Sequence, residues 1–377
     1  MKAACEEALK YGDALIPIDK NPTLVTVILN PVANKRKAKK EYTKYCEPLL
    51  HLAGLQVDVV QTAWEGHAKE ITESLKGTQA IIVAGGDGTL SESVTGLLRR
   101  TDNANQFPIG ILPLGEKNTF GNILFPGGKT VDKVKQLIEA SMAIIKGNTV
   151  WKDVVKIEPL TKDNETPGRP IYALSSIHWG AFRDTLAKKD KYWYFGPWRE
   201  YATFIFNGYK SSLKWQCKGT IKYTPPCSGC QNCIEHRPEP RNWKWIFLTS
   251  NVKSHENNDV SKIENQLCGT TQELCFMTSK LLIKTPNVCK DQVEIPGLNI
   301  VLGQNKYTYA QFVKEGWKRL TGEIDSDNPI RARTVELIPE DISDGDIIEI
   351  DSEDYDVKPF RIELLHNFIK FFVTSSV

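Results

Sequence analysis

Hydrophobic and polar positions follow two alternating patterns over residues 23–148. The first is a short run rich in β-branched residues, typical of a buried strand, found at 23–30, 55–62, 79–86 and 107–115. The second is the helical spacing of apolar residues, found at 35–54, 67–77, 90–100 and 131–147. Because strands and helices alternate, the pattern predicts an α/β unit whose doubly wound parallel sheet is covered on both faces.

The pattern changes after residue 159 to short strands, turns and long polar inserts. Strand-like runs occur at 169–180, 244–251, 281–286 and 347–373, whereas 217–245 and 252–310 are too rich in turn residues for assignment. We therefore predict a nucleotide-binding α/β domain over 15–148. A β-rich, lipid-binding domain over 149–377, mostly an antiparallel β-sandwich, is predicted to follow, and its final segment could return to the first domain.

Composition and charge narrow the function classes. The chain has 377 residues, 41% hydrophobic content and a net charge of +2, with basic residues gathered at 34–40 in a run typical of a solvated helix face. Nucleic acid is therefore not an expected partner. No run reaches the roughly 18 apolar residues of a membrane span. Residues 1–16 begin within a helical pattern, so we expect that a targeting or anchoring segment stood upstream.

The nine cysteines are scattered, which favours reduced thiols over a secreted disulfide framework. One cluster differs, because Cys227, Cys230 and Cys233 follow at two-residue spacings with His236 shortly after. Such spacing can present thiolates to a tetrahedral zinc ion. No second ligand pair stands at a standard distance, so structural Zn²⁺ and a loop with free thiols or one disulfide are both open.

The stretch AGGDGT ends the third predicted strand and precedes a helical pattern expected to begin at Thr89. Ligands of open parallel sheets bind beyond the carboxyl ends of the strands. Gly85, Gly86 and Gly88 would let backbone amides approach an anion, and the helix would point its positive end to the same place. A turn that needs positive φ is the alternative, but it would need one glycine rather than three. The stretch predicts a phosphate site.

Asp87 stands among these glycines and needs its own explanation. A carboxylate beside phosphate-binding amides is repelled unless it meets a hydroxyl or a cation. A phosphoryl-transfer site uses such a group to accept the proton of the attacking hydroxyl or to hold Mg²⁺. Asp87 is therefore the candidate catalytic base. Glu92 is open between nucleotide contact and a capping box with Thr89, whose amide it would satisfy.

These motifs identify a family resemblance. GGDGTLSESVTG resembles the nucleotide signature of the diacylglycerol kinase catalytic domain family, which includes sphingosine, ceramide and bacterial lipid kinases. LNPVANKRKA (29–38) is similar to its first phosphate loop, LPLGEKNTFG (112–121) to its second loop, and EIDSEDYDVKPFRIEL (349–364) to its acidic C-terminal segment. Segments 3–17, 100–116 and 178–198 are most similar to the mitochondrial acylglycerol kinases of the family.

The resemblance implies roles for individual residues. Nucleotide or phosphate contacts are implied for Asn30, Lys35, Gly85, Gly86, Gly88, Thr89, Glu92, Asn118, Arg199, Asp351 and Glu353. Asp87 would be the base, and Asp184 would lie at the lipid head group. The chain departs from the family at Ala33, Asn34, Arg36 and Ser352, where many relatives have glycine.

The run KYWYFGPWREYATFIFNGYK (191–210) is dense in aromatic residues. Aromatic side chains bury large areas, so core or a domain interface is one interpretation. The other is the wall of an acyl pocket or a surface that rests on a membrane, with Trp193, Trp198 and Phe204 as candidates.

Taken with the resemblance, these features predict an ATP- and Mg²⁺-dependent lipid kinase. It would phosphorylate monoacylglycerol and diacylglycerol to lysophosphatidic and phosphatidic acid. The resemblance implies a mitochondrial location in the intermembrane space, associated with the membrane through an N-terminal anchor. NAD kinase, which shares the GGDGT loop, is the enzymatic alternative, although it does not predict LNP followed by lysines. A scaffolding subunit of a mitochondrial membrane protein complex is the alternative from another class.

Overall fold

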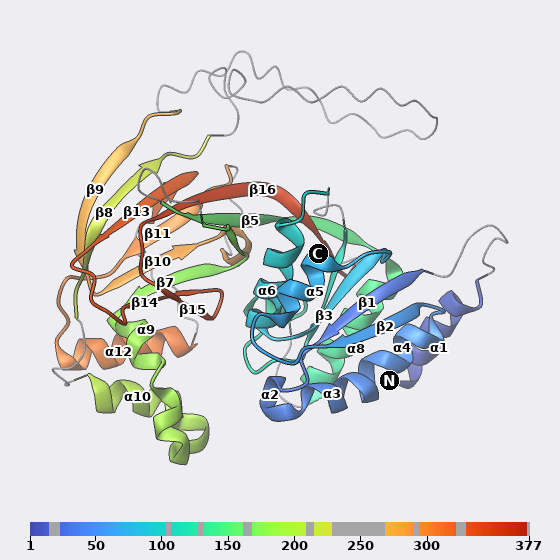
Figure 1. The fold of residues 1–377 in the computed structure, drawn as a ribbon. Helices are drawn as coiled ribbons and strands as arrows, with labels where there is room; N and C mark the ends of the chain where they lie inside the picture. Colours follow the sequence, from blue (N-terminus) through green and yellow to red (C-terminus); the bar gives the residue numbers. More distant parts are fainter. Residues whose placement is uncertain are drawn as a thin grey trace.

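The structure is a computed structural model, and it has two lobes (Figure 1). The residues described are 1–14, 23–102, 107–126, 131–160, 168–208, 215–227, 268–289, 295–321 and 329–374. The strand expected at 244–251 lies outside them.

The first lobe is built on parallel strands in the order β2-β1-β3-β4. Their bounds are β1 Leu24–Leu29, β2 Gln56–Gln61, β3 Ala80–Gly85 and β4 Ile109–Pro113. Strand β3 is buried along its whole length, whereas the edge strand β2 alternates between exposed and partly buried positions. The packed helices are α1 Lys2–Gly12, α4 Glu47–Leu52, α5 His67–Ser74, α6 Asp87–Leu98 and α8 Val131–Lys146. The predicted parallel α/β class is confirmed.

The helix expected over 35–54 is divided into four pieces. They are α2 Ala33–Arg36, α3 Ala38–Glu41, the π-helical η1 Tyr42–Cys46, and α4. Asn34, Lys35 and Arg36 have φ of 50°, 55° and 65°, a left-handed backbone that ends any regular helix. Pro48 in the first turn of α4 has no N–H to donate to the preceding turn, which accounts for the wider π turn before it.

The second lobe is a sandwich of two sheets. The first sheet continues beyond β4, where β16 pairs parallel with β4 and the further strands pair antiparallel with one another. Their bounds are β5 Thr149–Pro159, β6 Ile171–Ala173, β8 Cys217–Thr224, β9 Gln272–Thr278, β13 Thr334–Glu340 and β16 Phe360–Phe372. The second sheet has the order β12-β11-β10-β7-β14-β15. Its bounds are β7 Ser176–Gly180, β10 Lys280–Lys284, β11 Leu298–Leu302, β12 Ile330–Ala332, β14 Ile347–Ile350 and β15 Glu353–Asp356. The inner faces share one apolar core, so the predicted sandwich is confirmed.

Four helical segments lie beneath the second sheet in Figure 1. They are α9 Ala181–Leu186, the 3₁₀ segment η3 Lys189–Trp198, α10 Arg199–Asn207 and α12 Tyr309–Thr321. Phe182, Phe204 and Phe312 form a small core among them. None of the helices in the described parts of the chain has the length and apolar character that a bilayer span requires.

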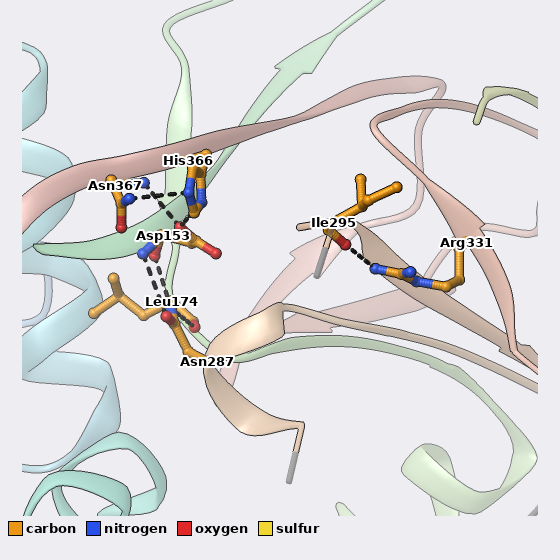
Figure 2. Close-up of polar contacts among 7 residues, drawn as sticks. All are labelled: Asp153, Leu174, Asn287, Ile295, Arg331, His366 and Asn367. Atoms are coloured by element: carbon orange, nitrogen blue, oxygen red, sulfur yellow. Dashed lines mark hydrogen bonds and ion pairs between the residues drawn. The ribbon is translucent and has the colours of Figure 1, made fainter. Parts of the chain in front are cut away.

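Strands β5 and β16 run side by side through both lobes (Figure 1). Their register shifts between Leu365 and Ile369, and Figure 2 shows how this irregularity is held. Asp153 Oδ1 accepts the Asn367 backbone N–H at 2.8 Å and lies 2.7 Å from His366 Nδ1. Asn287, in the 3₁₀ turn η5 Pro286–Val288, donates to the Asp153 carbonyl at 2.7 Å. The end of β16 pairs with β4 through Phe371 and Ile109, so it joins the sheet of the first lobe.

Candidate active site

A cavity of about 470 Å³ lies between the carboxyl ends of the parallel strands and the second lobe, within the usual size of a small-molecule site. The first lobe lines it with the segments after β1, β2, β3 and β4. The second lobe contributes the turn between β14 and β15. The lining residues are Asn30, Val32, Ala33, Asn34, Thr62, Ala63, Trp64, Glu65, Ala68, Gly86, Asp87, Gly88, Thr89, Glu92, Gly115, Glu116, Lys117, Ser352 and Glu353.

Glycine backbone allows the loops after β3 and β4 to meet. A Cβ added to Gly86 would lie 2.9 Å from the Lys117 carbonyl oxygen, and one on Gly115 would lie 2.3 Å from the Gly86 Cα. Gly86 has φ of −104°, which any residue can adopt. The need for glycine therefore comes from this close approach and not from positive φ, the alternative that the sequence left open.

Asp87 begins α6, two residues before the expected start. Its buried carboxylate accepts the backbone N–H of Thr119 at 2.9 Å and that of Phe120 at 3.4 Å, at the start of the short helix α7 Thr119–Leu124. Asp87 thus braces the neighbouring loop while it lines the cavity. Asn30 Nδ2 donates to Thr89 Oγ1 at 3.0 Å, which joins the loops after β1 and β3.

Glu92 lines the cavity but does not form the capping box. Its Oε1 accepts the Gly66 N–H at 2.8 Å and its Oε2 accepts the Ala68 N–H at 3.2 Å, so it caps α5 instead. The capping-box interpretation is wrong, because α6 starts at Asp87 and the Glu92 side chain points across to the neighbouring helix. Burial raises the pKa of this carboxyl above its ordinary value.

Glu353 brings a carboxylate from the second lobe to the glycine loop. A Cβ added to Gly88 would stand 3.5 Å from Glu353 Oε1. Tyr355 donates its hydroxyl to Glu353 Oε2 at 2.7 Å. Burial, and then the neighbouring Glu92, raises the pKa of Glu353 to about 7, although the Tyr355 hydrogen bond opposes the shift.

Asp351 does not line the cavity, contrary to the role implied for it. Its buried carboxylate accepts the backbone N–H groups of Leu174, Ser175 and Ser176 and the Ser175 hydroxyl. It therefore fixes the turn between β6 and β7. Ser352, which replaces the family's glycine, has φ of 72° and lines the cavity.

Four other residues implied to contact nucleotide also lie outside the lining. Arg199 forms ion pairs with Glu116, which does line the cavity, and with Asp190 at 3.2 Å. The Asn118 side chain accepts the Gly115 N–H at 3.0 Å and donates to the Gly115 carbonyl at 2.8 Å, so it shapes the loop. Lys35 is likewise not a lining residue, although Ala33 and Asn34 are. Gly85 packs against Thr89, where a Cβ would come within 2.7 Å of the hydroxyl oxygen.

A chain of charges joins the cavity to α9 in the second lobe. Lys117 Nζ lies 3.8 Å from Glu349, and Arg183 Nε lies 3.9 Å from the same carboxylate. Arg183 also pairs with Asp354 and, at 3.2 Å, with Asp184. Burial raises the pKa of the Asp184 carboxyl. Asp184 is thus placed beside the cavity's charged rim rather than within its lining.

The predicted aromatic residues separate into two kinds. Trp193 is 74% exposed and Trp198 is 66% exposed, whereas Phe204 is 1% exposed and belongs to the small helical core. Phe204 is therefore a core residue, because α12 packs against it through Gly316, whose added Cβ would meet the Phe204 ring. The two tryptophans form part of an exposed aromatic surface.

Sequence reasoning missed the lining carboxylates Glu65 and Glu116, and also a tryptophan and a lysine. Trp64 stands three residues after the end of β2, is exposed, and stacks on His67 with ring centroids 3.9 Å apart. Its position beyond a parallel strand is a signal that could have found it. Lys117 stands inside the LPLGEKNTFG motif, from which only Asn118 was assigned.

The zinc hypothesis finds no support. Cys230, Cys233 and His236 lie outside the described residues, and Cys227 is a free thiol. Within the described ranges there is no cluster of three or more His, Cys, Asp or Glu side chains that could hold a metal ion.

The fold and the glycine loop define a class, the two-lobed kinases with a diacylglycerol kinase catalytic domain. The family model of that domain matches residues 24–157. A putative diacylglycerol kinase from Bacillus anthracis str. Sterne superposes with a TM-score of 0.57 and 18% identity, covering 95% of this chain and 100% of its own, which shows a shared fold.

The second lobe makes the assignment more specific. The acylglycerol kinase C-terminal family matches residues 174–377. Mitochondrial acylglycerol kinase from Homo sapiens is 34% identical over 379 residues, covering 98% of this chain and 87% of the relative. The Mus musculus protein is 34% identical over 386 residues with the same coverages. The chain therefore belongs to the acylglycerol kinase family, and it is an enzyme, a lipid kinase.

Proposed function

We propose that this lipid kinase transfers the γ-phosphate of ATP to the hydroxyl of monoacylglycerol and diacylglycerol, giving lysophosphatidic and phosphatidic acid. The observation that carries the proposal is the placement of Asp87 and Glu353, from opposite lobes, around one glycine loop in one cavity. The names of the relatives, acylglycerol kinases, support this substrate class.

The charges of the cavity fit a nucleotide bound together with Mg²⁺. Lys117 is the cationic lining residue, whereas Glu65, Asp87, Glu92, Glu116 and Glu353 are carboxylic acids. Proteins hold Mg²⁺ through one or two carboxylates together with substrate phosphates, and Glu353 would serve here. When bound, Mg²⁺ supplies neutralisation of charge on the transferring phosphate. The N–H groups at the start of α6 would bind the phosphates, and Trp64 would stack on the base.

Asp87 would accept the proton in the transfer step. The lipid hydroxyl oxygen attacks the γ-phosphorus, the bond from that phosphorus to the leaving ADP oxygen breaks, and the hydroxyl proton passes to the Asp87 carboxylate. The hydrogen bonds from Thr119 and Phe120 hold the carboxylate in one orientation. Such positioning is what a general base requires.

The lipid would arrive from a membrane on the side of η3 and α10. Exposed Trp193 and Trp198 are suited to the interface between water and a bilayer, and Asp184 lies at the far end of the chain of charges that begins at the cavity. A location in the mitochondrial intermembrane space, on the membrane, is part of the proposal and is supported by the mitochondrial relatives.

The experiment is a product analysis by mass spectrometry with ATP, Mg²⁺ and a panel of lipid alcohols, with NAD included as a competing acceptor. We expect phosphorylated monoacylglycerol and diacylglycerol and no NADP. The Asp87→Asn variant should form these products at least about 100-fold more slowly. Asp58→Asn, the same change at an exposed position of β2, should match the unmodified enzyme. Phosphorylated NAD without phosphorylated lipid would refute the proposal.

A further inference from the structure

The outer face of the second sheet carries basic side chains where its inner face is apolar. In the pairing of β7 with β10, Lys280, Leu282 and Lys284 lie opposite Gly180, His178 and Ser176. The alternating residues Leu281 and Ile283 belong to the sandwich core. Because neighbouring residues of a strand point to opposite faces, Lys280, Lys284 and His178 share the outer face.

Helix α12 packs on this outer face. Glu315 lies 3.7 Å from the nearly buried Lys280 Nζ. Arg319 comes one turn later, and its guanidinium carbon lies 4.1 Å from the centroid of the Phe182 ring. Phe312, one turn before Glu315, is fully buried against Phe182, with ring centroids 4.6 Å apart. The face of α12 that meets the sheet is therefore part apolar and part charged.

Arg319 is the unusual member of this face. Although the residue is partly exposed, its Nε and Nη2 atoms are buried and have no hydrogen-bond partner among the described residues. These two nitrogens form one edge of the guanidinium, the edge that binds phosphate or carboxylate with two parallel N–H groups. Leaving such donors unpaired costs free energy, so a buried pair of this kind calls for an acceptor.

Basic side chains surround His178 and Arg319, with Glu315 as an acidic neighbour. The pKa of Arg319 falls to about 10, chiefly through burial. That of His178 falls to about 3, first through burial and then through the charges of Arg319, Lys117, Lys284 and Lys280. Burial lowers the pKa of Lys284; Cys289 opposes the shift and Arg319 adds to it. Lys280 is already paired with Glu315, so Arg319 and Lys284 are the cations whose charge a phosphate monoester, at about −1.5 to −2 at neutral pH, would balance.

We propose that Arg319, Lys284 and Lys280 form a binding site for the phosphate monoester of a lipid. The unpaired Nε and Nη2 edge would take two phosphate oxygens, Lys284 would supply the remaining charge, and the apolar part would extend from there along α9 and α12. None of these residues lines the cavity of the active site. The site therefore lies apart from the position proposed for ATP, and it suits the phosphorylated class of lipid rather than its neutral precursor.

The test is binding to the full chain without ATP. The probes are a short-chain phosphatidate below its micelle concentration, the diacylglycerol with the same acyl chains, and inorganic phosphate. Calorimetry should show phosphatidate binding that Arg319→Met and Lys284→Met each weaken about tenfold or more, the scale of one hydrogen bond to a charged group. Lys314→Met, at an exposed position on the same helix, should bind as the unmodified chain does.

A second readout separates ligand binding from a structural role. Without ligand, Arg319→Met should raise the melting temperature, because it removes a buried cation with unpaired donors. A structural arginine would instead lower it and leave phosphatidate affinity unchanged in the folded protein. If Arg319→Met does not fold, Lys284→Met decides.

The proposal would be overturned if Arg319→Met and Lys284→Met bound phosphatidate as tightly as the unmodified chain does. It would also be overturned if the neutral diacylglycerol bound as tightly as phosphatidate. Inorganic phosphate binding as tightly as phosphatidate would overturn the lipid part and keep the phosphate part. Because neither ATP nor turnover enters the experiment, its result is independent of the proposed kinase reaction.

Discussion

Two buried aspartates, one in each lobe, use their carboxylates in the same way and differ in what they face. Asp87 accepts two backbone N–H groups at the start of α7, and Asp351 accepts three in the turn between β6 and β7. Asp87 nevertheless lines the cavity, whereas Asp351 does not. Both stand in motifs that resemble nucleotide-binding segments, so the motif identifies an important residue and the access of its side chain decides its chemistry.

The largest expected effect is on catalysis at Asp87. Asp87→Asn should lower the kinase rate about 10²- to 10⁴-fold, since a positioned proton acceptor is removed. The change retains one oxygen that can accept the Thr119 N–H, so thermal stability should fall by far less than the rate does. Steady-state kinetics and thermal unfolding of the same preparation check both parts. A rate within a few-fold of the unmodified enzyme would leave Asp87 with the bracing role alone, like Asp351.

Among the aromatic residues of the second lobe, the buried Phe204 and the exposed Trp198 can be compared in the same way. Phe204→Ala should cost about 3–5 kcal/mol of unfolding free energy, because it opens a cavity between Phe182 and Phe312. Trp198→Ala, at an exposed position, should change stability by less than about 0.5 kcal/mol. It should lower activity on long-chain monoacylglycerol in vesicles more than on a short-chain analogue in solution.

Urea unfolding and the two activity assays check these outcomes. Equal destabilisation by both changes would place Trp198 in the core after all. Equal activity loss on both substrates would remove the membrane role of the exposed aromatic surface.

How far the sequence predicts this molecule depends on how local each feature is. Strands β1 to β4 and the glycine loop were found because a few consecutive residues determine them. Helix α12 and its partners were not, since Phe312 meets Phe182 and Phe204 across more than a hundred residues of chain. For Glu92 the sequence leaves nucleotide contact and a capping box open, because its actual partners, Gly66 and Ala68, stand at the start of another helix.

Replacing Asp351 should lower stability more than the kinase rate, the reverse of the result expected for Asp87. Asp351→Asn loses the charge that accepts three backbone N–H groups and one hydroxyl, which should cost about 2–3 kcal/mol of unfolding free energy. The rate per folded molecule should stay within a few-fold of the unmodified enzyme. Urea unfolding and kinetics at a temperature where the variant remains folded check the prediction. A large loss of rate in fully folded protein would return Asp351 to the nucleotide site.

The smallest effect concerns His178, which the first lobe's Lys117 and three basic residues of the second lobe all influence. Its pKa falls from 6.5 to about 3 in the folded protein, so the folded state stays neutral while the unfolded state takes up a proton below pH 6.5. Stability is therefore lost as the pH falls through 6.5 toward 3. Between pH 7 and 5 this should cost on the order of 2 kcal/mol of unfolding free energy.

The variant His178→Gln tests this loss. Glutamine keeps a group that can contact the Ser176 hydroxyl but does not titrate, so over the same pH interval the variant should lose about 2 kcal/mol less unfolding free energy than the unmodified chain. His51→Gln, at an exposed position, should follow the unmodified chain. Urea unfolding at both pH values, in buffer free of phosphate and sulfate, measures the difference. Equal losses in all three proteins would mean that His178 gains its proton within the fold, which would require an anion or water beside the Arg319 group to offset the surrounding positive charge.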